Sequence, residues 1–348
     1  MANRGRRKPG RPGPSQVRAA APRTAPAIRP PAPVVVVDEG VLPPAGATFL
    51  SILRGRSFVW WRSLLGVFFA LSLFLLLIGL VSQVVISLAW STTGSGLPYV
   101  EFFRQAAAFE RPVGMLAAHL AIMTLAVISA AMMLVVHQVR PRWLLSVEGR
   151  VRWRYLVICL GVAVVALNGM LLLSLSVEGF LGFEVQTGFW AFLVVIVLTT
   201  PLQAVAEEVF FRGYLLQALG GVVAAPWFGI VVSSLIFAYV HGSQNLALFC
   251  DRLAFGVLAA ILVRLTGGLE AGIAAHVINN LFAFTIAGVT TSIAEVKAIS
   301  SLTFSQAAFD VAGFALFAMI AYAVARRMKL RARVALPASP APSSAGPV

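Results

Sequence analysis

Long apolar runs recur along the chain, each close to the length that a helix needs to cross a lipid bilayer. A spanning helix needs about 20 predominantly apolar residues, and its backbone groups must find their hydrogen bonds within the segment. Eight runs meet this description: residues 64–90, 113–137, 155–177, 188–206, 226–244, 247–266, 270–288 and 307–325. The sequence therefore predicts an all-α polytopic membrane protein with about eight transmembrane helices.

The charge content agrees with lipid as the surrounding solvent. Charged residues make up 11% of the chain and hydrophobic residues 59%, whereas soluble domains carry about 25% charged residues. The net charge of +14 could suit nucleic acid, but no basic face is interleaved with aromatic residues. We therefore expect the bilayer, and not nucleic acid, as a partner. The oligomeric state stays open, and the two cysteines, Cys159 and Cys250, give no disulfide framework.

Basic loops predict the orientation. The segment before the first run is basic, and loops 91–112 and 178–187 carry no positive excess. The other basic residues gather in two places: Arg140, Arg142, Arg150, Arg152 and Arg154 in one loop, and Arg326, Arg327, Lys329, Arg331 and Arg333 after the last run. Because cytoplasmic loops are enriched in Lys and Arg, we expect a multi-pass protein of the plasma membrane with both termini cytoplasmic. An arginine bias over lysine also suggests a bacterial, GC-rich source.

Composition divides the chain into five parts. Residues 1–48 and 334–348 are rich in Pro and Ala, lack apolar periodicity and are predicted to be disordered tails. The first of these tails also carries arginines that suit anionic headgroups, namely Arg4, Arg6, Arg7 and Arg11. Between the tails lie the N-terminal transmembrane helices, 49–187, a polar-marked core, 188–288, and a final loop and helix with a basic end, 289–333.

Two adjacent carboxylates stand where lipid should exclude charge. Arg212 follows Glu208 by four residues, a spacing at which helical side chains form an ion pair. Glu207 projects about 100° away on the same helix and is free for other work. An ionisable group at mid-membrane costs on the order of 3 kcal/mol. These residues therefore mark either a membrane boundary with a local salt bridge or a cavity inside the protein.

Two further polar groups lie in later apolar runs. Phe237 and His241 share one helix face, and so do His276 and Asn280. Taken singly, His241 fits an interfacial histidine, and His276 with Asn280 fits an interhelical hydrogen bond. The chain has only four histidines, so polar groups in three nearby runs together favour one site.

Three short motifs thus follow one another: Glu207-Glu208-x3-Arg212, Phe237-x3-His241 and His276-x3-Asn280. Together they resemble the signature of the CPBP intramembrane proteases, which include the type II CAAX prenyl endopeptidases and bacterial ABI-like relatives. The resemblance covers residues 188–288. It implies an eight-helix membrane fold whose site opens toward the cytosol and inner leaflet, and a membrane-associated peptide or protein substrate.

The same resemblance implies a role for each motif residue. Peptide hydrolysis needs a base and donors for the developing oxyanion. The implied roles are Glu207 as general base with His241 as its partner, His276 and Asn280 as oxyanion donors, and Glu208, Arg212 and Phe237 as structural support.

Metal binding stays open at this stage. Glu207, His241 and His276 could supply a tetrahedral zinc site with one open position, whereas a metal-free arrangement uses the same side chains. The family is usually classed among metalloproteases, although HExxH is absent here. The expected cofactor is therefore zinc or none.

Depth in the membrane is the difficulty of the predicted topology. If the spans alternate, Glu207 and His276 lie near the cytoplasmic side. His241 then lies ~22 Å away, since it follows Pro226 by 15 residues. The three meet only if residues 218–226 dip into the membrane, or if the helices around Glu207 begin and end elsewhere.

Three functions are compatible with buried charges in apolar helices. The first is an intramembrane endopeptidase, which the complete set of motif residues favours. The second is a non-catalytic scaffold or immunity-type interaction protein of the same family. The third is a small-solute or ion transporter, which the lack of an internal repeat disfavours.

Overall fold

The computed structural model describes residues 1–2, 42–55, 57–179 and 182–335. Most of both predicted tails, with the lipid-binding arginines assigned to the first, therefore lies outside the described residues. Apart from two isolated bridges, the regular secondary structure of the described part is helical. The all-α fold class is thus confirmed.

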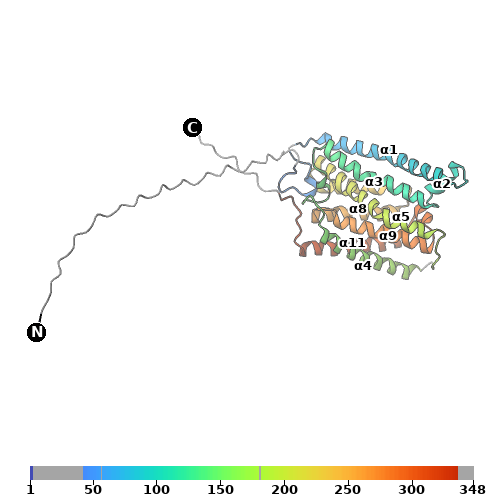
Figure 1. Ribbon diagram of the computed structural model, residues 1–348. Helices are drawn as coiled ribbons and strands as arrows, with labels where there is room; N and C mark the ends of the chain where they lie inside the picture. Colours follow the sequence, from blue (N-terminus) through green and yellow to red (C-terminus); the bar gives the residue numbers. More distant parts are fainter. Residues whose placement is uncertain (3–41, 56, 180–181, 336–348) are drawn as a thin grey trace. The chain divides into compact units, whose positions relative to one another are not determined.

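The helices run up and down through one bundle (Figure 1). Their bounds are α1 Trp60–Thr93, α2 Tyr99–Ala107, α3 Pro112–Val135, α4 Trp153–Glu178, α5 Phe189–Glu208, a π-helical segment Val209–Leu215, α6 Leu216–Val222, α7 Pro226–Tyr239, α8 Leu246–Thr266, α9 Glu270–Thr290, α10 Ile293–Ala298 and α11 Phe304–Arg327. In the described part, seven helical stretches are long and apolar enough to cross a membrane, and α7 is an eighth, shorter apolar helix. This arrangement confirms a polytopic membrane fold.

The fourth predicted span ended too early. The structure continues it as one 34-residue helical stretch from Phe189 to Val222. Hydropathy alone stops at the charged pair Glu207 and Glu208, but these side chains are buried and paired inside the bundle. The stretch passes through the π-helical segment, all of whose residues are buried.

The short helix α2 was also missed, because it is too short and too polar to be read as a span. Its Phe102 and Ala106 are buried, whereas Glu101 and Arg104 pair with each other on its exposed side.

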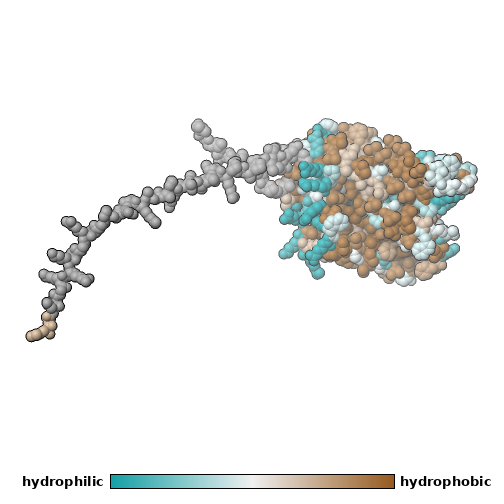
Figure 2. Space-filling view, viewed as in Figure 1, coloured by the Kyte–Doolittle hydropathy of each residue, from teal (hydrophilic) through white to brown (hydrophobic). Residues whose placement is uncertain are grey.

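The helix flanks are apolar, as lipid requires (Figure 2). Large exposed hydrophobic side chains cover much of α1, among them Phe68, Leu75 and Leu80. The interior lies around α5, which packs against α3 and α9, while α4 packs against α9 and α11. A buried stretch at the centre and exposed apolar flanks are the pattern expected of a bundle in lipid.

The loops at one end of the bundle are joined to one another, and we call this the basic end: residues 42–55, 57–59, 136–152, 223–225, 267–269 and 328–335. Gly46 donates its backbone N–H to the carbonyl oxygen of Val334, and Val147 donates to Gly267. Ala47 and Val334 are buried. The folded part therefore extends into the edges of the segments predicted as tails.

The loops at the other end of the bundle form what we call the opposite end: residues 94–111, 179, 182–188, 240–245 and 291–303. Here Glu184 donates its backbone N–H to Val289, and Asn245 donates to Ser300.

Candidate active site

The continuous helical stretch from Phe189 to Val222 explains how Glu207 and His241 can lie at the same depth in the membrane. Glu207 lies 15 residues before Val222, and His241 lies 15 residues after Pro226. The chain turns between these two helices, so both side chains lie about 22 Å from the turn along nearly antiparallel paths. The helices around Glu207 thus end elsewhere than predicted, and the two residues reach the same level.

Glu207 has one oxygen bound and one free. Its side chain is only 8% exposed. Gln203, one turn earlier on α5, donates its amide to Oε1 at 2.7 Å. Among the described residues, no hydrogen-bond donor reaches Oε2, but Nε2 of His276 lies 3.4 Å from it. A buried carboxylate oxygen without a donor has lone pairs available for a water molecule.

Glu208 holds two partners from two helices. Its Oε1 accepts from Nη1 of Arg212 at 2.9 Å and lies 2.9 Å from Nδ1 of His276. A carboxylate already paired with a guanidinium accepts hydrogen bonds and does not donate them. Nδ1 of His276 therefore carries a proton, and the ring presents Nε2 toward Glu207.

Aromatic rings surround the Arg212 guanidinium. It lies 4.0 Å from the centroid of the Phe237 ring and 5.0 Å from that of Phe255. Both rings also pack edge-on against the imidazole of His276. Cation–π contacts of this kind stabilise a charge in a desolvated position, and Phe237 makes such a contact beside His276.

His241 lies at the end of α7, with its side chain exposed. Its Nδ1 is 2.6 Å from the carbonyl oxygen of Phe237. A carbonyl can only accept, so Nδ1 donates and Nε2 is the nitrogen with a free lone pair in the neutral ring. The imidazole bound against Glu207 is that of His276, which differs from the expected pairing of Glu207 with His241.

Asn280 joins the site through Gln203. Its Nδ2 donates to Oε1 of Gln203 at 3.2 Å, and its Oδ1 accepts from Nδ2 of Asn279 at 3.2 Å. Gln203 thus links the carboxylate of Glu207 to the amide of Asn280. Sequence reasoning missed Gln203, although a polar residue one helical turn before Glu207 in an apolar run was a usable signal.

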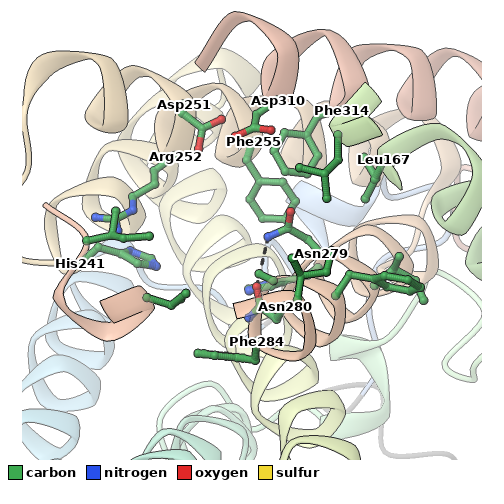
Figure 3. Close-up of a pocket in the computed structure, with 18 of the residues that line it drawn as sticks. Leu167, His241, Asp251, Arg252, Phe255, Asn279, Asn280, Phe284, Asp310 and Phe314 are labelled. Carbon is green, nitrogen blue, oxygen red and sulfur yellow. Dashed lines mark hydrogen bonds between the residues drawn. The ribbon is translucent and has the colours of Figure 1, made fainter. Parts of the chain in front are cut away.

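One cavity of about 580 Å³ collects these side chains. Figure 3 shows the two asparagines on α9 facing its interior, with His241 on one side. The predicted residues Glu207, His241, His276 and Asn280 all line it, as do four further charged residues: Asp251, Arg252, Lys297 and Asp310. The four motif residues therefore converge on a single hollow inside the bundle.

This region matches a known family. Residues 188–282 match the family model described as type II CAAX prenyl endopeptidase Rce1-like. We refer to this part of the chain as the Rce1-like domain, after the family that it resembles. It runs from the turn before α5 into α9 and includes every motif residue.

A curated relative is similar to part of the chain. The chain is 32% identical over 106 residues to the uncharacterized protein YyaK of Bacillus subtilis (strain 168). The aligned part is 29% of this chain and 35% of that protein, so the match spans about a third of the relative's length. No solved structure matches the chain.

The Rce1-like domain does not assemble the three-residue metal set that the sequence left open. Glu207 and His276 approach each other, whereas in the described part no hydrogen bond or ion pair joins either of them to His241, whose bond is to the Phe237 carbonyl. Within the described ranges, no three His, Cys, Asp or Glu side chains are grouped as metal ligands. The arrangement thus does not fit a zinc site of Glu207, His241 and His276.

The buried charges of the Rce1-like domain need one more proton. Glu207 and Glu208 bring two carboxylates, and Arg212 brings one cation, all three at most 8% exposed. A net buried charge is costly, so a proton on His276 or Glu207 balances the cluster. His276 contacts both carboxylates and is placed to carry it.

Proposed function

We propose that the chain is an intramembrane endopeptidase that hydrolyses a peptide bond of a membrane-associated protein or peptide. The observation that carries this proposal is the free Oε2 of Glu207, which lines the cavity 3.4 Å from Nε2 of His276. A general base must lie within reach of the proton that it removes. The family match of residues 188–282 supports the same chemistry.

The first step forms the tetrahedral intermediate. Water bound at Oε2 of Glu207 attacks the carbonyl carbon, and Glu207 takes the water proton. Nε2 of the charged His276 imidazole and Nδ2 of Asn280 donate to the oxyanion, each worth about 3 kcal/mol of transition-state stabilisation. Asn280 is held in place by Gln203.

The second step breaks the carbon–nitrogen bond. The departing amine takes up the proton that Glu207 removed from water, either directly from Glu207 or through His241. His241 suits such a relay because its Nε2 lone pair, free while Nδ1 donates to the Phe237 carbonyl, can accept that proton and pass it to the amine. Glu208, Arg212 and Phe237 orient His276, and no step passes through a metal ion.

Replacing Glu207 by Gln tests the proposal. The purified protein is reconstituted and offered a library of peptides, and cleavage is followed by mass spectrometry. We expect Glu207→Gln to lose activity at least ~100-fold, since the amide keeps the shape but cannot take a proton. The experiment includes chelator and zinc arms, so that any metal requirement is measured directly.

The matched control is Glu101→Gln. Glu101 makes an exposed ion pair with Arg104 on α2 and lies outside the cavity lining. We expect this variant to cleave as the wild type does. Equal cleavage by wild type and Glu207→Gln would remove the proposed base, and a folded wild type that cleaves nothing would favour the non-catalytic scaffold.

A further inference from the structure

Two acidic side chains line the cavity apart from the motif residues. Asp251 on α8 and Asp310 on α11 both contribute to its wall, and these two helices pack against each other. Figure 3 shows their carboxyl groups turned toward each other beside the Phe255 ring, and the two groups interact electrostatically. We call Asp251 and Asp310 the acidic pair.

Aromatic rings join the acidic pair to the residues proposed for chemistry. Asp251 and Asp310 lie in the second turns of α8 and α11, which both begin at the opposite end. Four residues further along each helix, the rings of Phe255 and Phe314 pack with centroids 4.9 Å apart, and the Phe255 ring lies 5.2 Å from the imidazole of His276. Since one helical turn rises ~5.4 Å, the acidic pair lies about 10 Å from this imidazole. That distance corresponds to about three residues of an extended peptide.

The acidic pair has no counter-ion within the described part of the chain. No ion pair there includes Asp251 or Asp310, and Oδ1 of Asp251 is a buried atom that no hydrogen-bond donor reaches. Glu178, at the end of α4, adds a further negative charge near Asp310. Neighbouring carboxylates that are partly withdrawn from water repel each other and are stabilised by a cation.

The cationic side chains in the cavity wall are engaged elsewhere. Nη1 of Arg252 donates to Oε1 of Gln244 at 2.7 Å, so Arg252 acts on Asp251 only as a more distant charge. Nζ of Lys297 lies 5.2 Å from the centroid of the Phe109 ring. The acidic pair is therefore free to receive a cation that enters the cavity.

We infer that Asp251 and Asp310 bind the cationic side chain of a lysine or arginine in the peptide substrate, and so select where the peptide is cut. The inference rests on the proposed function. The same cavity holds the free Oε2 of Glu207, whose side chain is 8% exposed, so a peptide lying against Glu207 also passes the acidic pair. Carboxylates bind guanidinium and ammonium groups through charge-assisted hydrogen bonds. The selected residue lies within about three positions of the cleaved bond.

Matched peptides test this selection. A peptide that the reconstituted protein cleaves is remade with lysine, or with the uncharged norleucine, at each position within about four residues of the cleaved bond. We expect one position at which lysine raises kcat/KM over norleucine by at least ~10-fold, because a charge pair formed away from bulk water contributes strongly to binding. Equal cleavage of the two peptides at every position would overturn the inference and leave the acidic pair to a proton or an inorganic cation.

The double variant Asp251→Asn with Asp310→Asn removes the charge and keeps the shape of the pair. We expect its lysine-to-norleucine ratio of kcat/KM to fall toward one, while the norleucine peptide is cleaved as by the wild type. The matched control is Glu184→Gln with Glu295→Gln, which removes the same charge from exposed positions at the opposite end, outside the cavity lining, and should keep the preference. A lysine preference that survives in the asparagine variant would refute the assignment.

A binding measurement separates this inference from the proposed function. Fluorescein-labelled leucine–alanine peptides with one central lysine or norleucine are titrated with the Glu207→Gln protein in detergent, and fluorescence anisotropy is read. We expect the lysine peptide to bind at least ~10-fold more tightly, and both peptides to bind equally once the acidic pair is also replaced by asparagine. Equal affinities with the pair intact, including no binding of either peptide, would overturn the inference alone. A lysine preference in binding, with no cleavage of any peptide by the wild type, would overturn the proposed function and leave the acidic pair as a cation-binding subsite.

Discussion

At the scale of the residue, the site depends on exact contacts between α5 and α9. Oε1 of Glu208 binds Arg212 and His276, while Oε2 lies against the backbone of α9 at Gly272. A Cβ added there would stand 2.7 Å from Oε2. Gly272 therefore lets a carboxylate approach the helix that carries the imidazole.

Gly272→Ala should accordingly destabilise the protein. Overpacking at a buried contact costs about 1–3 kcal/mol, and any shift of Glu208 also releases Nδ1 of His276. We expect a lower thermal unfolding midpoint in detergent and reduced cleavage. Gly161→Ala on α4 is the control, since a Cβ there meets nothing within 4 Å and alanine favours the helix. Equal midpoints for the two variants would contradict this account.

A second residue-scale prediction concerns pH. His137, in a loop of the basic end, is buried beside Tyr214. Burial, aided by the charge of Arg62, lowers its pKa from 6.5 to about 4. The unfolded chain therefore binds a proton between these values that the folded chain does not. This contribution to stability is complete above pH 6.5 and is lost as the pH falls toward 4, by up to about 3 kcal/mol.

His137→Gln removes that titration. We expect the unfolding free energy of the wild type to fall between pH 7 and pH 4.5 by more than that of the variant. Other groups titrate in both proteins and cancel in the comparison. Parallel pH profiles would mean that His137 is protonated in the folded protein, against the assignment.

At the scale of the element, the start of α9 is fixed to the loop before α4. Arg152 and Glu270 form a buried bidentate pair, with Nη2 to Oε2 at 2.5 Å and Nε to Oε1 at 2.8 Å. Arg152 also donates to the carbonyl oxygen of Thr266 at 2.7 Å. The pair ties α4, α8 and α9 together two turns before His276.

Neutralising one residue of this ion pair should lower the free energy of unfolding more than replacing both residues. Glu270→Gln leaves the Arg152 cation buried without its counter-charge, and we expect a loss of about 3–5 kcal/mol in unfolding free energy. The double replacement Arg152→Leu with Glu270→Leu should recover much of it. Glu148→Gln, which breaks the exposed pair with Arg150, should stay within about 1 kcal/mol of the wild type. Similar losses for the single and double variants would refute the account.

Much of the fold followed from the sequence, because lipid imposes length and hydropathy on each span. The bounds of α1, α3, α4, α8, α9 and α11 lie within a few residues of those predicted. The fourth span failed because its polar residues are satisfied by other helices, which hydropathy does not register. Convergence of the motif residues on one cavity was predictable, whereas the contacts of His276 with both carboxylates and the role of Gln203 needed three-dimensional packing.

At the scale of the whole molecule, polarity is separated along the bundle as well as across it. The flanks are apolar, one end is strongly basic, and the cavity lies toward the other end. The charges that determine insertion are therefore distant from the residues proposed for chemistry. Because the two sets of residues are not in contact, a substitution in one set should not directly disturb the other.

The two helices joined by residues 223–225 position Glu207 and His241, so the distance between these residues depends on the number of residues in each helix. Adding or removing one residue in either arm would shift Glu207 or His241 by about 1.5 Å and rotate it by about 100° relative to the other. Substitutions in the turn would leave both in register. We therefore expect natural variants of this segment to differ by substitutions, with few insertions or deletions.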